Sequence, residues 1–275
     1  MALALPSLIF LGSCGDEASS DPKPTISLGT GGAFISASKD VVAGTAVIFN
    51  VKATAGSGAM KNVQIKAAWG TQTKTILDTA LTTKEINFNR SLIALGAAGD
   101  EVVYTFTAND GNGQSSSTSV TLSMTPAMTS LEGQSGFKVY NASSITLPSA
   151  FDLYNAQEII SGTSVEKDIL DKTAISAAQW SKTWGSGNGS TFVKVAANDW
   201  VNGTYTTYLF NLYKANKTKM TETITSLAKD DIILVRSGKD ITFNLFIVKI
   251  TAVVDLPAIG NHNDYYQFDY RGILK

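Results

Sequence analysis

Six aromatic and polar residues with the chemistry of a sugar-binding site lie within residues 180–205. They are Trp180, Trp184, Asn188, Asp199, Trp200 and Tyr205. Exposed Trp and Tyr rings can stack on the apolar face of a pyranose, and amide or carboxylate groups then bond its hydroxyls. The pattern predicts a ligand-binding site with a glycan as the leading ligand class. The alternative is that two of the tryptophans are core residues, which is the commoner role of large aromatic side chains.

Acidic residues in the same half of the chain raise the question of hydrolysis, because glycosidases use a pair of carboxylates. The candidates are Asp152, Glu158, Glu166, Asp168, Asp230 and Asp231. Adjacent Asp230 and Asp231 would point to opposite faces of a strand, so they do not form a facing pair. A turn before Ile232 explains them better. We therefore expect a non-catalytic protein and keep a glycoside hydrolase as a remoter alternative.

The sequence contains few side chains that could bind a metal ion or act as a thiol. It has one cysteine and one histidine, His262, which we expect in an exposed turn. The run 109–113 resembles a calcium loop in its Asp and Asn content, but no Glu closes it at the EF-hand distance. Its Asp-Gly and Asn-Gly pairs favour a hairpin turn instead. We predict no metal site and no cofactor.

The N-terminus contains an apolar run, residues 2–11, which is too short to span a bilayer. Leu11-Gly12-Ser13-Cys14 resembles the lipobox of bacterial lipoproteins, although no Lys or Arg precedes Cys14. The resemblance implies a signal peptide over residues 1–13, lipidation of Cys14, and a tether over residues 14–24. Gly15-Asp16-Glu17 resembles the surface-export signal of Bacteroidetes-type lipoproteins, and the alternative is that these residues are only part of a solvated tether. We therefore expect an outer-membrane lipoprotein of the cell envelope, exposed at the cell surface.

The charge and composition of the sequence limit the kinds of partner that the protein is expected to bind. The net charge is −1 and the Lys and Arg residues are scattered, so we expect no nucleic-acid binding. The charged fraction of 16% is below the roughly 25% usual for globular proteins. The expected partners are a membrane, through the N-terminal lipid, and a glycan or another surface protein.

Residues 25–126 show seven short segments in which apolar and polar residues alternate, a pattern typical of a β-sandwich. They are residues 25–28, 47–51, 63–69, 75–77, 85–89, 101–107 and 117–123. The run Tyr104-Thr-Phe-Thr-Ala-Asn-Asp-Gly-Asn-Gly-Gln114 resembles the last hairpin of bacterial Ig-like and PKD-like modules. That resemblance implies a spacer or contact module.

Residues 137–275 form a second β-rich module, preceded by a predicted linker over residues 125–136. Residues 243–250 are its strongest predicted strand, and residues 174–180 could form one or two helical turns. Residues 204–213 fit a strand or a helix equally well. The segment from Ala150-Phe-Asp-Leu-Tyr154 to Asp264-Tyr-Tyr-Gln-Phe-Asp-Tyr270 resembles the C-terminal part of uncharacterised Bacteroidetes-type lipoproteins, which implies location and no chemistry.

Together these observations predict an all-β protein, with an Ig-like sandwich followed by a second sandwich or barrel-like domain, and an α+β fold is the other alternative for the second domain. The leading functional hypothesis is a non-catalytic cell-envelope lipoprotein that serves as a binding or accessory module. The alternative is a structural or adhesive surface protein, such as a fimbrial or envelope component.

Overall fold

The structure is a computed structural model that describes residues 22–144, 146–160, 166–241, 243–256 and 263–275. The predicted lipidation site and the histidine therefore lie outside the described residues.

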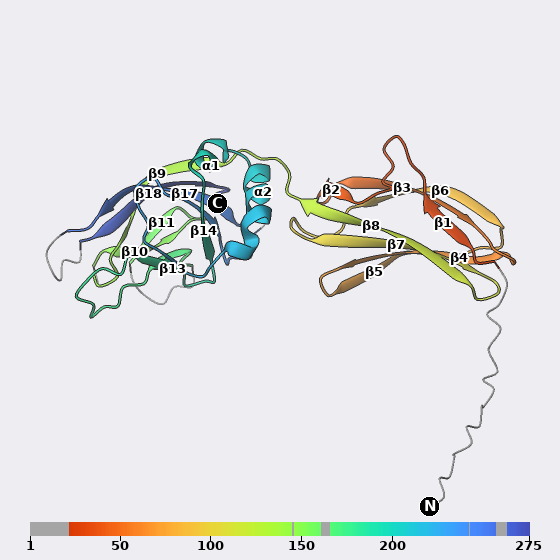
Figure 1. The fold of residues 1–275 in the computed structure, drawn as a ribbon, viewed down its shortest axis with the longest axis horizontal. Helices are drawn as coiled ribbons and strands as arrows, with labels where there is room; N and C mark the ends of the chain where they lie inside the picture. The colour runs from red at the N-terminus through yellow and green to blue at the C-terminus, as the bar shows by residue number, and fades with distance from the viewer. Residues whose placement is uncertain (1–21, 145, 161–165, 242, 257–262) are drawn as a thin grey trace, which may run out of the picture. The chain divides into compact units, whose positions relative to one another are not determined.

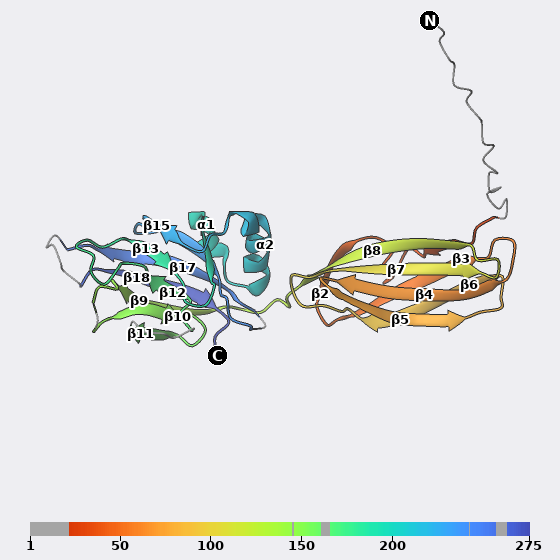
Figure 2. The same ribbon diagram turned by 90° about the horizontal axis from the view of Figure 1, so that it is seen from below.

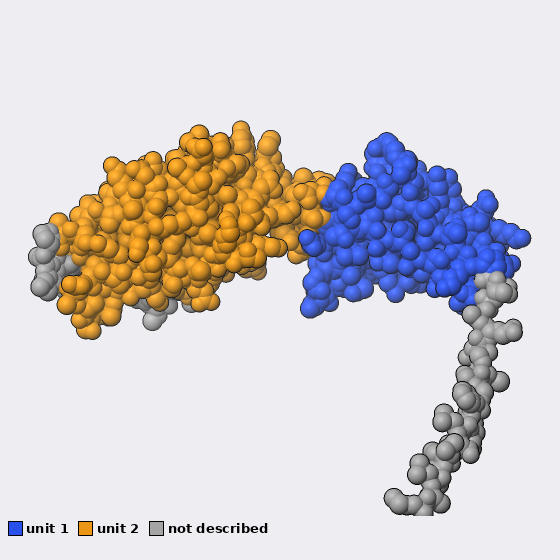
Figure 3. Space-filling model, in the orientation of Figure 1, with its two compact units in different colours: residues 1–39, 46–93, 101–122 blue, residues 40–45, 94–100, 123–275 orange. Residues whose placement is uncertain are grey.

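The chain divides into two compact units (Figure 3). Most of the first unit comes from residues 46–93 and 101–122, and most of the second comes from residues 123–275. Each unit is built largely from β-strands (Figure 1), which confirms the all-β prediction.

The first eight strands form two sheets, with the orders β1-β3-β6 and β2-β8-β7-β4-β5. Their bounds are β1 Thr25–Leu28, β2 Lys39–Val42, β3 Ala46–Thr54, β4 Met60–Trp69, β5 Gln72–Ala80, β6 Glu85–Ile93, β7 Glu101–Asp110 and β8 Ser115–Thr125. All seven predicted strands are present, and β2 is an additional one.

The alternation of apolar and polar residues along the strands explains why these two sheets pack face to face. In β7, Val102, Tyr104 and Phe106 are all fully buried while the residues between them face outward. Phe49 of β3 reaches this row from the other sheet, with ring centroids 5.4 Å from Tyr104 and 5.0 Å from Phe106. These aromatic contacts join the two sheets into a sandwich.

The second unit also contains two sheets, with the orders β11-β10-β12-β13-β15 and β14-β16-β17-β18-β9. The strands are β9 Glu132–Tyr140, β10 Pro148–Asp152, β11 Gln157–Ile160, β12 Ile169–Asp171, β13 Thr183–Gly185, β14 Thr191–Val195, β15 Ile224–Thr225, β16 Ile232–Arg236, β17 Leu245–Val254 and β18 Tyr265–Gly272. The helices are α1 Ala197–Asn202, α2 Thr206–Asn216 and the single turn η1 Lys217–Lys219.

Large aromatic side chains fill the space between these sheets. Phe151 of β10 packs edge-on against Phe268 of β18, with centroids 5.1 Å apart. Trp184 of β13 meets Tyr266 of β18 at 5.2 Å. Because rings from both sheets interlock, the second unit has its own core, independent of the first.

Strands β16 and β17 are buried on both faces. The sheet β11-β10-β12-β13-β15 covers one face of their sheet, and helices α1 and α2 cover the other (Figures 1 and 2). Leu209 and Phe210 of α2 pack against Ile232, Leu234 and Ile247 of these strands. Burial on two sides requires a continuous apolar strand, and this explains the runs Ile-Ile-Leu-Val and Leu-Phe-Ile-Val in the sequence.

The structure decides one open choice and differs from two local predictions. Residues 206–216 are helical, so the open choice for residues 204–213 resolves mainly as helix. Residues 174–180 form turns and no helix, so that prediction was wrong. Strand β9 begins at Glu132, inside the stretch expected to be a linker.

In the part of the chain that the structure describes, no helix is long and apolar enough to cross a membrane.

Candidate functional site

The structure separates the six predicted site residues into three groups. Two of the tryptophans belong to the core, Asn188 belongs to a buried polar cluster, and three residues lie at the surface near α1 and α2.

Trp180 and Trp184 do not form an exposed platform, so the prediction is wrong for these two residues. Trp184 is fully buried, and Trp180 retains 8% of its surface. Both rings pack on Tyr266, with centroid distances of 4.6 Å for Trp180 and 5.2 Å for Trp184. A ring enclosed in this way has no free face for a sugar, and the core alternative holds for both.

The side chain of Asn188 forms hydrogen bonds with neighbouring side chains of the second unit. Its Nδ2 donates a 2.8 Å hydrogen bond to Asp168 Oδ1, and its Oδ1 accepts one of 2.6 Å from Ser190 Oγ. Asn188 therefore helps to hold a buried carboxylate and is separated from the surface residues of the predicted site.

The three remaining predicted residues, together with Val201 and Tyr208, form what we call the helical patch: Asp199, Trp200, Val201, Tyr205 and Tyr208. Tyr205 lies directly before α2 and is 43% exposed, while Val201 at the end of α1 is 68% exposed. The six-residue helix α1 and the start of α2 thus present both side chains to solvent. This is the part of the predicted site that remains accessible.

Asp199 fixes the polar part of the helical patch. Its Oδ2 accepts the backbone N–H of Ala196 at 2.8 Å, which stabilises the start of α1. Its Oδ1 accepts the hydroxyl of Tyr208 at 2.6 Å. This hydrogen bond raises the pKa of the Tyr208 phenol, so the hydroxyl remains protonated and ties α2 to α1.

Trp200 is only half-buried, and one ring face is already occupied. The guanidinium carbon of Arg271 in β18 lies 4.2 Å from its ring centroid, while Arg271 Nη1 donates to the Trp200 carbonyl at 2.5 Å. Trp200 also packs on the apolar cluster beneath α2. Its ring anchors α1 to the sheet, which leaves Tyr205 as the exposed aromatic side chain of the helical patch.

The predicted acidic residues fall into exposed and buried groups. Asp230 and Asp231 lie in a turn before β16, as expected, and form surface ion pairs with Lys249 at 3.2 Å and Lys194 at 2.7 Å. Glu158 accepts the backbone N–H of Lys138 at 2.9 Å.

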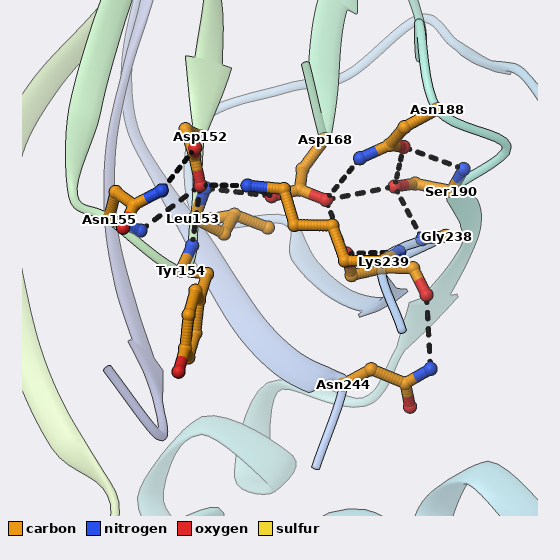
Figure 4. Close-up of polar contacts among 11 residues, drawn as sticks. Asp152, Leu153, Tyr154, Asn155, Asp168, Asn188, Ser190, Gly238, Lys239 and Asn244 are labelled. Atoms are coloured by element: carbon orange, nitrogen blue, oxygen red, sulfur yellow. Dashed lines mark hydrogen bonds and ion pairs between the residues drawn. The ribbon is translucent and has the colours of Figure 1, made fainter. Parts of the chain in front are cut away.

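Asp152 and Asp168, in contrast, are fully buried and are central to what we call the buried acid cluster (Figure 4). Its members are Asp152, Asp168, Asn188, Ser190, Ser237 and Lys239. They come from the end of β10, the segment before β12, the loop before β14 and the turn between β16 and β17.

Asp168 is held by donors on both oxygens. Its Oδ1 accepts hydrogen bonds from Asn188 Nδ2, from Ser190 Oγ at 3.2 Å and from Ser237 Oγ at 2.5 Å. Its Oδ2 accepts the backbone N–H of Leu153 at 2.9 Å. These four donors satisfy both oxygens of a carboxylate that is buried away from water.

Asp152 is held by the turn that follows β10. Its Oδ1 accepts the backbone N–H groups of Tyr154 and Asn155, each at 3.0 Å, and its Oδ2 accepts Asn155 Nδ2 at 2.8 Å. Lys239 Nζ lies 2.5 Å from Asp152 Oδ1 and 3.8 Å from Asp168 Oδ2. The cluster thus has two fully buried carboxylates and one largely buried ammonium.

Sequence reasoning missed Lys239. The only local signal is Ser-Gly-Lys directly after the apolar strand β16, and that signal is equally typical of an exposed turn.

The loop at residues 109–113 makes the turn between β7 and β8. Asp110 Oδ1 accepts the backbone N–H groups of Asn112 at 3.0 Å and Gln114 at 2.9 Å. Across the described ranges, no three His, Cys, Asp or Glu side chains are grouped to hold a metal ion.

No protein-family model matches the chain, and no curated protein matches its sequence. Among solved structures, a DUF4466 family protein from Parabacteroides merdae is similar at 13% identity, with a TM-score of 0.31, 91% of this chain covered and 98% of that one. The sporulation control protein Spo0M from Bacillus subtilis is similar at 9% identity, with a TM-score of 0.26, 83% of this chain covered and 78% of that one. Both likenesses are too low to carry an argument about function.

Proposed function

We propose that this chain is a non-catalytic, lipid-tethered protein of the bacterial cell surface whose second unit binds a glycan at the helical patch. The observation that carries the binding site is the exposure of Tyr205, 43% of whose surface is open, beside the exposed Val201. An aromatic ring with apolar and polar neighbours is the surface that suits a sugar, which has an apolar face and a rim of hydroxyls.

The polar groups needed for hydroxyl recognition lie on the same short segment. Asn202 is exposed at the end of α1, and the Asp199 carboxylate is half-buried and held in place by Tyr208. Because α1 is fixed to β18 through Trp200 and Arg271, little conformational freedom would be lost on binding. Preorganised aromatic and amide groups of this kind support a weak, specific interaction.

Affinity electrophoresis of the folded protein in gels containing soluble polysaccharides tests the binding site. We expect Tyr205→Ala to weaken retardation roughly ten-fold and Tyr205→Phe to preserve most of it, because the ring and not the hydroxyl makes the stacking contact. Ile175→Ala is the matched control, since Ile175 is 69% exposed and lies outside the helical patch. Wild-type mobility unaffected by every polysaccharide, or equal retardation of Tyr205→Ala, would overturn the glycan proposal.

The tether is tested separately in a bacterial host. We expect labelled palmitate to enter the full-length protein and not the Cys14→Ser variant, because a thioether can form only at the cysteine sulfur. Membrane fractionation should follow the same division, since acyl chains contribute about 0.8 kcal/mol of anchoring per buried methylene. Equal labelling of the two proteins, or none of either, would contradict the lipoprotein proposal.

A structural or adhesive role is the second candidate, and strand β6 supports it. Among the described strands, β6 ends its sheet and pairs with β3 alone, over Glu85–Ile93, so its other edge could accept an added strand. Arg90 faces Phe49 across this pair and is an inward-directed charge of the kind that limits uncontrolled edge pairing. Ile93→Lys at the end of β6 should abolish any oligomer seen by sedimentation velocity, whereas a wild type that is monomeric at all concentrations would count against this role.

A further inference from the structure

The Lys239 ammonium is directed at one buried carboxylate with a second beside it. Nζ lies 2.5 Å from Asp152 Oδ1 and 3.8 Å from Asp168 Oδ2. The Lys239 side chain is 14% exposed and both aspartates are fully buried, so bulk water is largely kept from these three groups (Figure 4). Because the aspartates are closed to bulk solvent, the groups placed to react with them are the other members of the cluster.

We infer that Lys239 and Asp152 condense with one another, forming an intramolecular amide between Nζ and the Asp152 carboxyl carbon, with Asp168 as the proton carrier. The reacting groups are already in contact in the folded chain. Holding two reactants in this way replaces a bimolecular step by an intramolecular one, with effective molarities of about 10⁵ M or more for well-aligned groups.

The backbone around Asp152 supports the acyl-transfer step. When Nζ adds to the carboxyl carbon, negative charge develops on the oxygen that will become the amide carbonyl. Asp152 Oδ1 already accepts the N–H groups of Tyr154 and Asn155, each at 3.0 Å. Two preorganised backbone donors on one oxygen are the arrangement that stabilises such an oxyanion.

The atoms balance without any further reactant. An ammonium and a carboxylate together contain the atoms of one amide and one water. Asp168 takes a proton from Nζ and passes it to Asp152 Oδ2, and a second proton follows the same path after the N–C bond has formed. Oδ2 then leaves as water, the C–O bond breaks, and Asp168 returns to its carboxylate form held by Leu153, Ser190 and Ser237.

The amide would join the two sheets of the second unit. Asp152 ends β10 in one sheet, whereas Lys239 lies in the turn between β16 and β17 of the other. The cross-link closes a loop of roughly 90 residues, and it should raise Tm by on the order of 10 °C relative to a variant that cannot form it.

Intact mass spectrometry of the full-length, denatured protein tests the inference. The wild type should lack the mass of one water relative to its processed sequence, and protease digestion should yield one branched peptide that joins Lys239 to Asp152. Lys239→Arg should show the full sequence mass, because the guanidinium keeps the charge and is not a nucleophile. Asp168→Asn should also show the full mass while its circular dichroism remains native.

Two features of the chain sharpen this experiment. Lys194 and Lys249 form exposed pairs with Asp231 and Asp230, so they are internal controls, and neither should be found cross-linked. Cyclisation at Asp110-Gly111 would also remove one water, but it would persist in Lys239→Arg and would be cleaved by hydroxylamine. A wild type of full sequence mass, or a loss of water that survives Lys239→Arg, would overturn the inference.

Discussion

Trp180 Nε1 donates a 2.7 Å hydrogen bond to Asp171 Oδ2 in the interior of the second unit, where both side chains are buried. Asp171 Oδ1 also accepts the backbone N–H groups of Ala142 and Thr173, each at 3.0 Å. One carboxylate therefore satisfies three donors, two of them in residues 172–182 and the third at Ala142, and it explains why this irregular stretch holds a fixed position.

Removing this carboxylate should destabilise the second unit. Asp171→Ala leaves the indole N–H and two backbone N–H groups without their partner, and we expect a loss of about 2–4 kcal/mol in the free energy of unfolding. Urea denaturation followed by tryptophan fluorescence measures it. Asp255→Ala is the matched control, because Asp255 forms an exposed ion pair with Lys182 and should change stability by less than about 1 kcal/mol. Equal midpoints for the two variants would contradict this role of Asp171.

The strands of the first unit were predictable from sequence because alternation is a local property. Val102, Tyr104 and Phe106 occupy every second position of β7, and no knowledge of the other strands is needed to recognise the buried face. Strand β2 escaped this reasoning because its four residues are all exposed or half-buried and leave no alternating pattern.

The candidate site was harder to predict because exposure is a tertiary property. Trp180 and Trp184 are buried by Tyr266, which is distant in sequence, and their Gly- and Asn-rich surroundings resemble a binding loop. Asn188 and Asp168 are likewise brought together only by the fold. Asp199, Trp200 and Tyr205 remained close because one short helix and the start of the next contain all three.

Gly238 lies between Ser237 and Lys239 of the buried acid cluster, donates its backbone N–H to Ser190 Oγ at 3.1 Å and should not tolerate a side chain. A Cβ at this position would lie 1.9 Å from the backbone oxygen of Asn188, and backbone cannot move aside as a flexible side chain can. Gly238→Ala should cost about 1–3 kcal/mol, the usual range for overpacking. At Gly133 in β9 the nearest atom to such a Cβ is 3.8 Å away, so Gly133→Ala should leave the urea midpoint nearly unchanged. A harmless Gly238→Ala would show that the loop around residues 186–190 is looser than the structure indicates.

Arg271 should resist conservative replacement. Its guanidinium lies over the Trp200 ring at 4.2 Å and donates to the Trp200 carbonyl, and lysine cannot make both contacts with the same geometry. We expect Arg271→Lys to lower stability by about 1–2 kcal/mol and to increase hydrogen exchange of the amides of α1. Arg236→Lys is the control, because Arg236 is exposed and lies farther from its ring, 5.9 Å from the centroid of Tyr213. Unchanged exchange in α1 would show that this helix is held by other contacts.

Tyr270 should make the second unit sensitive to alkali. Burial, reinforced by the negative charge of Asp168, raises the pKa of its phenol far above the ordinary value. The stability that this shift provides is complete below the unfolded-state pKa of about 10, and it is lost as the pH rises further, because the unfolded phenol ionises while the folded one stays protonated. In urea denaturation at a series of pH values above about 10, the free energy of unfolding of Tyr270→Phe should therefore fall less steeply with pH than that of the wild type.

At neutral pH the same substitution should be neutral or mildly stabilising. The Tyr270 hydroxyl is buried and has no hydrogen-bond partner among the described residues, so its removal relieves an unpaired polar group, worth up to about 1 kcal/mol. Tyr266→Phe is the matched comparison, because burial raises the pKa of Tyr266 in the same direction, yet its hydroxyl donates to the Lys182 carbonyl at 3.3 Å. Tyr266→Phe should gain the same resistance to alkali and lose stability at neutral pH. If Tyr270→Phe were instead the more damaging variant at neutral pH, the hydroxyl of Tyr270 would have to bind a partner, such as a buried water beside the acid cluster.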